Sequence, residues 1–422
     1  MAFPSTLDFK LKPNAVLSRS LQQVHVPESG SSATPGQAVY VDLSAGRYGN
    51  YIDGSQSYLT FKVTNLDSNA MVIDGSAFSF IERMVVMSSG TIISDFVQHY
   101  GAWAQAMLDI QMSGPGKNFA STFMGTGRDA STNFVRSGAT ISANGSLYVC
   151  LPLLGTIFDP ACNGDKLIPV GAISSLQLQM YLAATNDPVT TTSASANWKL
   201  DNIQLITSYV EIAPEAQHII DREFGGELRM AAEFWRNANF TLAAGSSGDS
   251  PVIPLKAQSL KSALFLYRLQ SNFGNAAALT MTSRINPFYS SANACSFAVT
   301  AGSALYPQVP LQNYSQFPIE LQKAFHTQYS PVGFQSQIDG VTYIAGDSTT
   351  ATSAGSFVAA LNLECYPSKS GAINSGVNVS GSSVLSLQTR YGLALPAATV
   401  MDVYGHYDAV LRFADGRVEV AW

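Results

Sequence analysis

Histidine and acidic side chains could supply chemistry, and their spacing along the chain shows whether they can act together. The sequence contains none of the local zinc-binding patterns, such as H-E-x-x-H or H-x-H. Ligands drawn from distant parts of the chain remain an alternative, but we expect no metal and no cofactor. His99 falls on an apolar helical pattern, so we expect it at the surface or in an interface. The five histidines are His25, His99, His218, His326 and His406.

Neither a nucleophile nor a phosphate-binding loop is indicated. The nucleophile-elbow pattern G-x-S-x-G is absent. Gly125-Thr126-Gly127 and Gly245-Ser246-Ser247-Gly248 lack the following Lys-Ser/Thr of a phosphate loop, so we interpret them as loop glycines. Asp402 and Asp408 lie on one expected strand, whereas the paired carboxylates of a glycosidase need a cleft and a separation of about 5–9 Å. We interpret both as ordinary edge or loop carboxylates and expect no catalytic residue.

The tryptophans leave a carbohydrate-binding alternative open. Such rings can stack on sugars, and with the Asn-rich loops they are compatible with a lectin-like or receptor-binding protein. However, Trp103 lies on the apolar helical pattern, and Trp235 and Trp422 flank expected strands. Packing in the core or against another subunit is therefore the favoured interpretation.

The cysteines give no sign of a disulfide or metal framework. They are widely dispersed, and none belongs to a C-x-x-C pair. We therefore expect four free and mostly buried thiols. They are Cys150, Cys162, Cys295 and Cys365.

The composition favours a protein that is buried in an assembly. Hydrophobic residues make up 46% of the 422 residues, and charged residues only 12%, against about 25% in average soluble proteins. A surface so poor in charge is a solubility risk for a free monomer. The net charge is −6, and no basic patch carries interleaved aromatic residues, so we expect no strong direct binding of nucleic acid.

No apolar run approaches the roughly 18 residues of a membrane span, and the N-terminus lacks an apolar signal region, so we expect synthesis in the cytosol.

The elements that must position these residues are mostly strands. In Leu147–Leu182, an apolar run broken by Pro152 is followed by a turn-rich spacer and then by strict alternation over Leu176–Leu182. Residues 1–24 are polar and irregular, which indicates a flexible arm. Residues 112–146 are interpreted as a long loop region. Further strands are expected at Ala38–Leu43, Tyr58–Thr64, Phe80–Val86, Thr91–Ser94 and Asn202–Ile212.

One segment between these strands has a helical period. Phe96, Tyr100, Trp103, Met107 and Ile110 recur at spacings of four and three residues, which predicts a helix that follows a cap at Asp95. Gly101 weakens this helix without forbidding it.

The same order of elements recurs in the second half. Expected strands at Leu260–Tyr267, Phe297–Val299 and Ala304–Tyr306 precede a short helical pattern over Phe317–Phe325. The hairpin glycines Gly90 and Gly302 lie 212 positions apart, and the same offset carries Leu147–Leu154 onto Ala359–Tyr366. The chain ends with Thr399–Phe413, the turn Asp415-Gly416 and Arg417–Trp422, a strong hairpin pattern. Two β-sandwiches of about 200 residues each, with one helix apiece, are therefore predicted.

Three of these segments also resemble a known family, the double jelly-roll major capsid proteins of double-stranded DNA viruses, with those of polinton-like viruses, adintoviruses and virophages closest. The similar residues are Leu151-Pro152-Leu153-Leu154 with Lys166-Leu167-Ile168-Pro169-Val170, then Ser296–Phe325, then Val400–Val420. The resemblance runs in order through most of residues 40–422, although each motif is short.

The resemblance implies an all-β fold of two tandem eight-stranded jelly rolls with short helices. We expect an N-terminal arm at 1–24, a first jelly roll at 25–214 and a second at 215–422. It also implies a non-catalytic structural protein that forms homotrimeric, pseudo-hexameric capsomers in the icosahedral shell of a virion. Penton and minor capsid proteins, and a host receptor, are the further partners it implies.

Within that expectation the spacer of Leu147–Leu182 becomes a candidate contact loop between neighbouring subunits. An insertion after Asn163 is then predicted to spoil assembly while each sandwich still folds. A β-sandwich enzyme, such as a glycoside hydrolase or lyase, is the third alternative beside the capsid and lectin-like interpretations.

Overall fold

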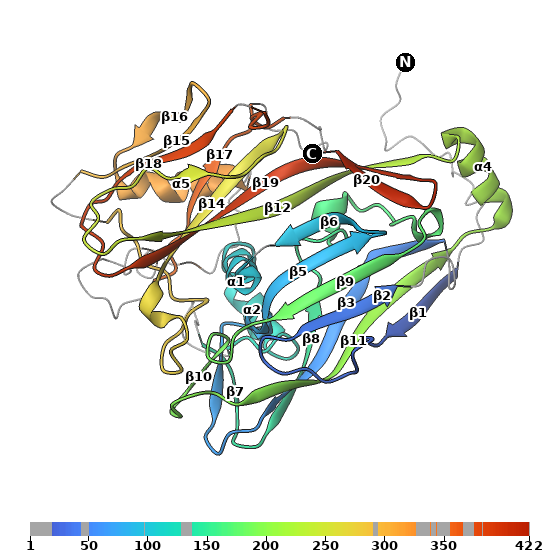
Figure 1. Cartoon of the computed structure of the whole chain (residues 1–422), viewed down its shortest axis with the longest axis horizontal. Coiled ribbons are helices and arrows are strands. Elements are labelled where there is room, and N and C mark those ends of the chain that lie inside the picture. Colours follow the sequence, from blue (N-terminus) through green and yellow to red (C-terminus); the bar gives the residue numbers. More distant parts are fainter. Residues whose placement is uncertain are drawn as a thin grey trace.

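The chain folds into two β-sandwiches that pack against each other (Figure 1). Apolar residues from both halves belong to one continuous buried cluster, so the core extends across the contact between them. The computed structural model describes residues 19–43, 50–96, 98–127, 137–289, 294–325, 338, 343, 355–365, 375–381 and 383–421.

The first sandwich consists of two four-stranded antiparallel sheets. One has the order β1 (Arg19–His25), β11 (Trp198–Glu211), β3 (Tyr51–Asn65) and β8 (Ser146–Pro152). The other has the order β2 (Ala38–Leu43), β9 (Leu176–Leu182), β5 (Ile81–Ser88) and β6 (Thr91–Phe96). Every second residue of β9 is buried, as the alternating sequence predicts, because neighbouring side chains of a strand point to opposite faces.

The second sandwich repeats this plan. Its first sheet has the order β12 (Leu228–Leu242), β19 (Thr399–Ala414), β14 (Leu260–Leu269) and β17 (Ala359–Asn362), with β20 (Arg417–Ala421) paired to β19. Its second sheet has the order β13 (Val252–Ile253), β18 (Leu385–Arg390), β15 (Ser296–Ala301) and β16 (Ala304–Leu311).

Both sandwiches have the strand order of a jelly roll. Numbered along each half, the eight strands lie in the orders 1-8-3-6 and 2-7-4-5 in both halves. The predicted repeat is confirmed, because β8 and β17 are each the sixth strand of their half and each lies at the edge of its sheet. Tyr366, the last residue of the segment predicted to match β8, lies outside the described residues. Gly90, Gly302 and Gly416 all have positive φ in the hairpins predicted for them.

Short helices and one small sheet complete the described structure. The predicted helices are confirmed as α1 (Tyr100–Gln111) after β6 and α5 (Phe317–Ala324) after β16. A three-stranded sheet, in the order β10 (Val189–Thr191), β4 (Met71–Asp74) and β7 (Ser137–Ile141), extends the first sandwich. The remaining helices include α2 (Gly114–Ala120), α3 (Pro160–Asn163), α4 (Pro214–Phe224) and the 3₁₀ turn η2 (Ala77–Phe80). None of the described helices is long and apolar enough to cross a membrane.

The prediction of a long loop at residues 112–146 is wrong. This region contains α2, strand β7 and the first residue of β8. The Ser113 side chain caps α2 by accepting a hydrogen bond from the backbone N–H of Gly116. Strand β7 is fixed by pairing with β4, which lies more than 60 residues earlier in the chain. Two glycines in α2 and this distant partner for β7 conceal both elements from local pattern analysis.

Two predicted boundaries are also wrong. Asp95 does not cap α1 but remains in β6, where Arg83 donates two hydrogen bonds to it, and α1 begins after His99. Residues 19–24 do not belong to an irregular arm, because they form β1 and pair with β11. Residues 1–18 lie outside the described part of the chain.

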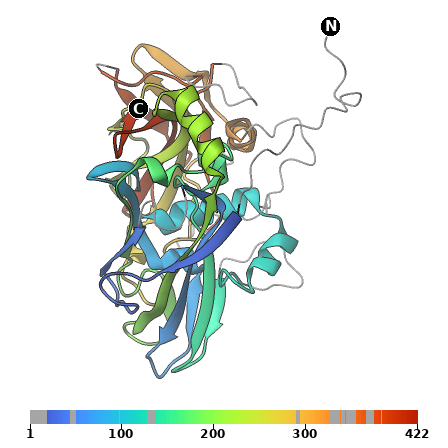
Figure 2. The ribbon, with the colours of Figure 1, turned by 90° about the vertical axis from the view of Figure 1, so that its right-hand side faces the viewer.

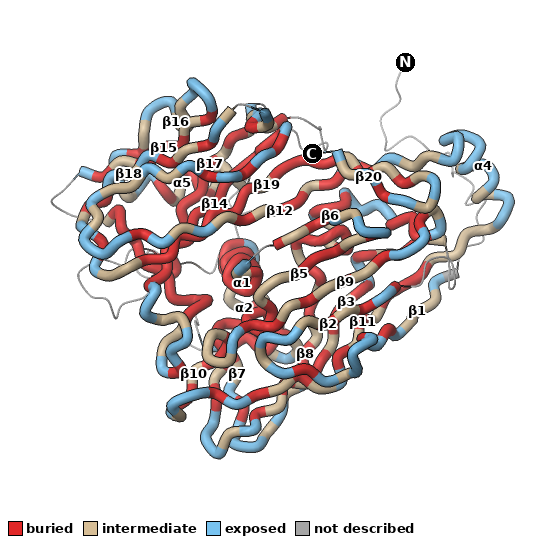
Figure 3. Tube along the Cα trace, in the orientation of Figure 1, coloured by how far each residue is buried: buried red, intermediate tan, exposed pale blue. Residues whose placement is uncertain are grey.

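Helix α1 lies between the two sandwiches. Its tube is drawn mostly in the colour of buried residues in Figure 3, and every residue from Tyr100 to Ile110 is buried. Gly101 is needed here for close packing, since a Cβ at this position would lie 2.8 Å from the backbone oxygen of Phe78 in η2. Strands β14 and β19 of the second sandwich lie on the side of α1 that faces away from the first sandwich (Figure 1). The helix and these two strands form the interface described next.

Candidate functional site at the interface between the two sandwiches

The face of β19 that points away from its own core carries polar residues. Tyr407, Ala409, Leu411 and Phe413 share the core face, as predicted. The intervening positions include Asp402, Tyr404, His406 and Asp408. His99 of the first sandwich contacts Asp402 and Tyr404, and His406 shares a cavity with Trp103. A strand with one apolar and one polar face is ordinarily half exposed, but almost all of β19 is buried.

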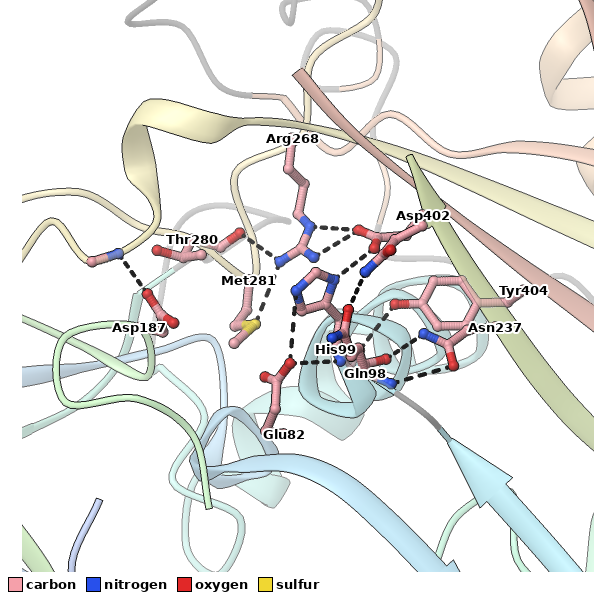
Figure 4. Close-up of polar contacts among 12 residues, drawn as sticks. Glu82, Gln98, His99, Asp187, Asn237, Arg268, Thr280, Met281, Asp402 and Tyr404 are labelled. Carbon is pink, nitrogen blue, oxygen red and sulfur yellow. Dashed lines mark hydrogen bonds and ion pairs between the residues drawn. The ribbon is translucent and has the colours of Figure 1, made fainter. Parts of the chain in front are cut away.

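A buried ion-pair cluster joins the two sandwiches around His99 (Figure 4). Arg268 from β14 donates to one carboxylate oxygen of Asp402 through Nε at 2.9 Å and Nη2 at 2.6 Å. The His99 Nδ1 atom lies 2.6 Å from the other oxygen, and its Nε2 atom lies 3.6 Å from Glu82 of β5. The Tyr404 hydroxyl donates to the backbone oxygen of His99 at 2.9 Å. Three residues of the second sandwich thus hold the N-terminus of α1.

The electrostatics of this cluster favour ionised Asp402. Burial alone raises the pKa of Asp402, but the charge of Arg268 and the contact with His99 more than offset it and lower the pKa to about 2. Both Arg268 and Asp402 are completely buried. The Arg268 guanidinium also lies 4.7 Å from the centre of the Phe273 ring, which completes its enclosure.

Asp74 forms a second link between the sandwiches. It stands at the end of β4 in the first half and accepts hydrogen bonds from a loop of the second half. The donors are the backbone N–H groups of Thr280 at 2.6 Å, Met281 at 2.5 Å and Thr282 at 3.2 Å, and the Thr282 hydroxyl at 2.5 Å. Burial raises the pKa of Asp74, and these hydrogen bonds only partly compensate.

Asp109 of α1 forms a third link. It accepts hydrogen bonds from Gln105 of the same helix at 2.9 Å and from Lys117 of α2 at 3.1 Å. Arg284 of the second sandwich donates to its other oxygen. Asp109, Lys117 and Arg284 are all buried, so α1 is tied to both halves by charged groups.

A fourth cluster lines a cavity of about 640 Å³ between the sandwiches. The ammonium group of Lys261 lies 2.6 Å from Glu233, 3.3 Å from Glu364 and 3.4 Å from Asp408. His406 lies 3.1 Å from Glu233. Burial raises the pKa of Glu233, but the contacts with His406 and Lys261 lower it to about 2.

Trp103 and Trp235 close this cavity from opposite sandwiches. Their ring centres are 5.6 Å apart, and Trp235 stacks on His406 at 4.6 Å. Both rings are buried, as predicted for core residues, whereas Trp422 lies outside the described residues. The lectin-like alternative therefore loses two of the three rings on which it was based.

The interpretation of Asp402 and Asp408 as edge or loop carboxylates is wrong. Both are buried in the central strand β19, and each is paired with a cation. Six residues of extended strand span roughly 20 Å, which is far beyond the separation of a glycosidase carboxylate pair. The two residues therefore cannot act together on one glycosidic bond.

The other predicted site residues are dispersed. His25 is buried beside the Thr207 hydroxyl at 3.0 Å, His218 is exposed on α4, and His326 lies outside the described residues. The four cysteines are free thiols, with Cys162 and Cys295 buried, Cys150 partly buried and Cys365 exposed. Within the described ranges, no three or more His, Cys, Asp or Glu side chains form a group that could hold a metal ion.

The spacer that ends in β9 also makes contacts within its own chain, and its predicted contact with a neighbouring subunit stays a prediction. Its helix α3 contacts β12 of the same chain, and Asn163 is buried, with its amide donating to the backbone oxygen of Ile157 at 2.9 Å. Residues 164–167 form an exposed tip. The effect of an insertion after Asn163 on assembly stays a prediction, because that point lies at the start of the exposed tip.

Nine charged residues of this interface were missed in the sequence: Asp74, Glu82, Asp109, Lys117, Glu233, Lys261, Arg268, Arg284 and Glu364. A usable signal is present in Leu260–Leu269, where Lys261 and Arg268 are the two charged residues of a mostly apolar strand. Charged residues are seldom fully buried unless they are paired, so such a strand indicates a second buried face with partners of opposite charge.

No family model and no curated protein sequence matches this chain. Solved structures do match it. The PBCV-1 virus capsid has a TM-score of 0.64 and 12% identity over 98% of both chains. The Faustovirus major capsid protein has a TM-score of 0.63 and 9% identity over 98% of this chain and 93% of its own. The mavirus major capsid protein has a TM-score of 0.52 and 10% identity over 100% and 95%, respectively. The chain therefore has the double jelly-roll fold of these viral major capsid proteins.

Proposed function

We propose that this chain is a major capsid protein that builds an icosahedral viral shell by self-assembly and has no catalytic role. The observation that carries the proposal is the identical strand order of the two sandwiches. A trimer of such chains presents six similar sandwiches, and hence six near-equivalent corners that suit hexagonal tiling of a closed shell. The likeness in fold to viral major capsid proteins over nearly the whole chain supports the same role.

The interface between the sandwiches supports this proposal physically. A capsid subunit must hold its two sandwiches in fixed relative positions, whereas domains joined by a small interface move relative to each other. Here a buried helix and several buried ion pairs join the halves. We place the boundary between the two units at α4, consistent with jelly rolls at 25–214 and 215–422, with the first strand beginning at Arg19.

The composition supports the partners that we propose. A chain with only 12% charged residues gains from extensive contact with other copies, first in a homotrimer and then with neighbouring capsomers. A net charge of −6 suits a shell that leaves genome neutralisation to other proteins. Penton and minor capsid proteins and a host receptor are further proposed partners, and the virion is the proposed location after synthesis in the cytosol.

Light scattering and electron microscopy of the purified full-length chain test this function. We expect a particle of three times the 44.9 kDa chain mass, with a hexagonal outline in micrographs. Increasing the protein concentration should yield sheets or closed shells. A chain that stays monomeric at every salt concentration and pH, without capsomers or shells, would contradict the proposal.

A further inference from the structure

The sheet β1-β11-β3-β8 carries an apolar row on the face that points away from its own core. The row consists of direct cross-strand partners on four successive strands, which therefore share one face: Val24, Ile206, Tyr58 and Pro152. Val24 is 54% exposed, and none of the four is buried, whereas Leu205 on the opposite face is. The outer face of an antiparallel sheet is ordinarily polar, so an apolar row there indicates a further partner.

The surroundings of the row suit a contact with protein. The adjacent row, Gln204, Thr60 and Cys150, carries no charge. A hollow of about 470 Å³ opens on the same side and is lined by residues that include Tyr58 and Phe123. The central parts of protein interfaces are poor in charge and rich in aromatic residues. This face therefore has the composition of an interface.

The second sandwich shows what contacts the equivalent face. Strands β1, β11, β3 and β8 are the first, eighth, third and sixth strands of their half, and β12, β19, β14 and β17 hold the same places in the other half. The outer face of that second sheet meets β6 and α1 of the first sandwich. Strand β6 contacts β12, His99 at the start of α1 contacts Asp402, and Trp103 packs on Trp235.

The second sandwich has its own strand–helix unit, β16 with α5, which corresponds to β6 with α1. Every residue of α1 from Tyr100 to Ile110 is buried, but Val309 of β16 is 70% exposed and Ile319 of α5 is 42% exposed. In Figure 1, β16 and α5 lie toward the left and β1 toward the right, on the side that faces the viewer in Figure 2. The exposed strand–helix unit and the apolar row therefore lie at opposite ends of one chain and meet only between chains.

We propose that the β16–α5 unit of one copy docks on the outer face of β1-β11-β3-β8 of a second copy. This contact repeats between chains the contact that joins the two sandwiches within each chain, and it places Val309 and Ile319 against the apolar row. The two contacting surfaces differ, so the interface is heterologous and closes into a ring when the rotation permits. The inference rests on the proposed self-assembly and assigns the surfaces that carry it.

Glutamate substitutions on each surface of the full-length chain test the contact. We expect Val24→Glu and Val309→Glu each to raise the concentration at which half of the trimer dissociates by about a hundredfold or more, because an uncompensated charge enters an apolar contact. Val252→Glu is the matched control, since Val252 is 60% exposed on β13, at the opposite edge of the sheet from β16, and its replacement should leave the trimer intact. All three positions are exposed in the single chain, so the circular dichroism spectra should match that of the wild type.

Mixing the two variants tests the direction of the contact. Val24→Glu keeps an intact β16–α5 unit, and Val309→Glu keeps an intact sheet face, so one productive contact remains between them. With one variant ¹⁵N-labelled, we expect native mass spectrometry of the concentrated mixture to show dimers of one labelled and one unlabelled chain. Dimers within one label, restored trimers or monomers alone would overturn the head-to-tail arrangement.

The outcomes separate this inference from the proposed function. A wild-type trimer that Val24→Glu and Val309→Glu leave as stable as Val252→Glu does would overturn the assigned surfaces, while the capsid function would stand. A wild-type chain that never assembles would overturn both.

Discussion

At the scale of single residues, Asp402 and Arg268 show how the interface uses charge. Both are fully buried, so both have lost their hydration, and their mutual contact compensates together with the contact of His99 with Asp402 and the hydrogen bond from Arg268 to the Thr280 backbone oxygen. Buried ion pairs add little net stability compared with apolar residues, but they strongly disfavour arrangements that leave one partner unpaired. We infer that this pair fixes the alignment of the two sandwiches more than it strengthens their contact.

Replacing Asp402 with alanine should destabilise the fold strongly. Arg268 would remain buried without its counterion, which typically costs about 3–5 kcal/mol in the free energy of unfolding. Denaturant unfolding followed by tryptophan fluorescence measures the change. Glu419→Ala is a suitable control, because Glu419 is 68% exposed in its pair with Arg412 and such surface pairs contribute at most about 1 kcal/mol. Equal effects of the two substitutions would contradict the role assigned to Asp402.

Acid should weaken the same interface. The pKa of Asp402 is lowered from its ordinary 3.8 to about 2, and that of Glu233 from 4.5 to about 2. Carboxylates with a depressed pKa stabilise the fold above their unfolded pKa and lose this contribution as the pH falls through the folded value. We therefore expect Tm to fall between about pH 4.5 and pH 2, and more steeply in the wild type than in a Glu233→Gln variant. Asp74, whose pKa is raised, works in the opposite direction. Identical pH profiles for the two proteins would exclude a contribution from Glu233.

At the scale of elements, α1 shows how one helix serves both sandwiches. It follows β6, as α5 follows β16, but α1 is buried on all sides whereas only three residues of α5 are buried. The two halves thus share one plan and use the equivalent helix differently. Tight packing of α1 against η2 explains the glycine in its first turn.

The Gly101→Ala substitution should therefore destabilise the protein. In an exposed helix interior, this change stabilises by roughly 0.5–1 kcal/mol, because alanine is the better helix former. Here the added Cβ would meet the backbone of Phe78 and Ser79 at 2.8 and 2.9 Å, so η2 or α1 must move and Tm should fall. In Gly116→Ala of α2, the Cβ would meet only the side chains of Met112 and Ser113, at 3.1 and 3.2 Å, and little change is expected. A higher Tm for Gly101→Ala would show that the contact with η2 is not limiting.

At the scale of the whole molecule, the two sandwiches form one unit. The apolar core is continuous across them, and links from Asp74, Asp109 and Asp402 cross the interface at separate places. Inter-domain contacts within a chain ordinarily permit relative motion. Here the buried helix and the ion pairs oppose such motion, as the proposed role in a shell requires.

Calorimetry should show this coupling as a single unfolding transition. In Asp74→Ala, the donors at residues 280–282 lose their common acceptor, and we expect the transition to broaden or to separate into two. Asp201→Ala removes two hydrogen bonds, from Thr64 and Ser32, that lie inside the first sandwich. That control should lower Tm and leave a single transition. Two transitions in the wild type would mean that the interface does not couple the sandwiches.

The sequence alone was sufficient for the repeated architecture. Alternating strands such as Leu176–Leu182, the hairpin turns at Gly90, Gly302 and Gly416, and the 212-residue offset are local patterns that report which residues face a core. They predicted both sandwiches, the helices α1 and α5, and the burial of Trp103. The family resemblance added the jelly-roll order of the strands.

Only the tertiary structure decided how the two sandwiches meet. Asp402 and Asp408 have the alternation of a solvent-exposed strand face, and nothing near them in sequence shows that a second sandwich covers them. Their partners come from elsewhere along the chain, as Arg268 and His99 do for Asp402, because the pairing energy of buried charges depends on distance in space. Local patterns determine which face of a strand is polar, whereas the packing of two complete sandwiches determines whether that face meets water or another charge.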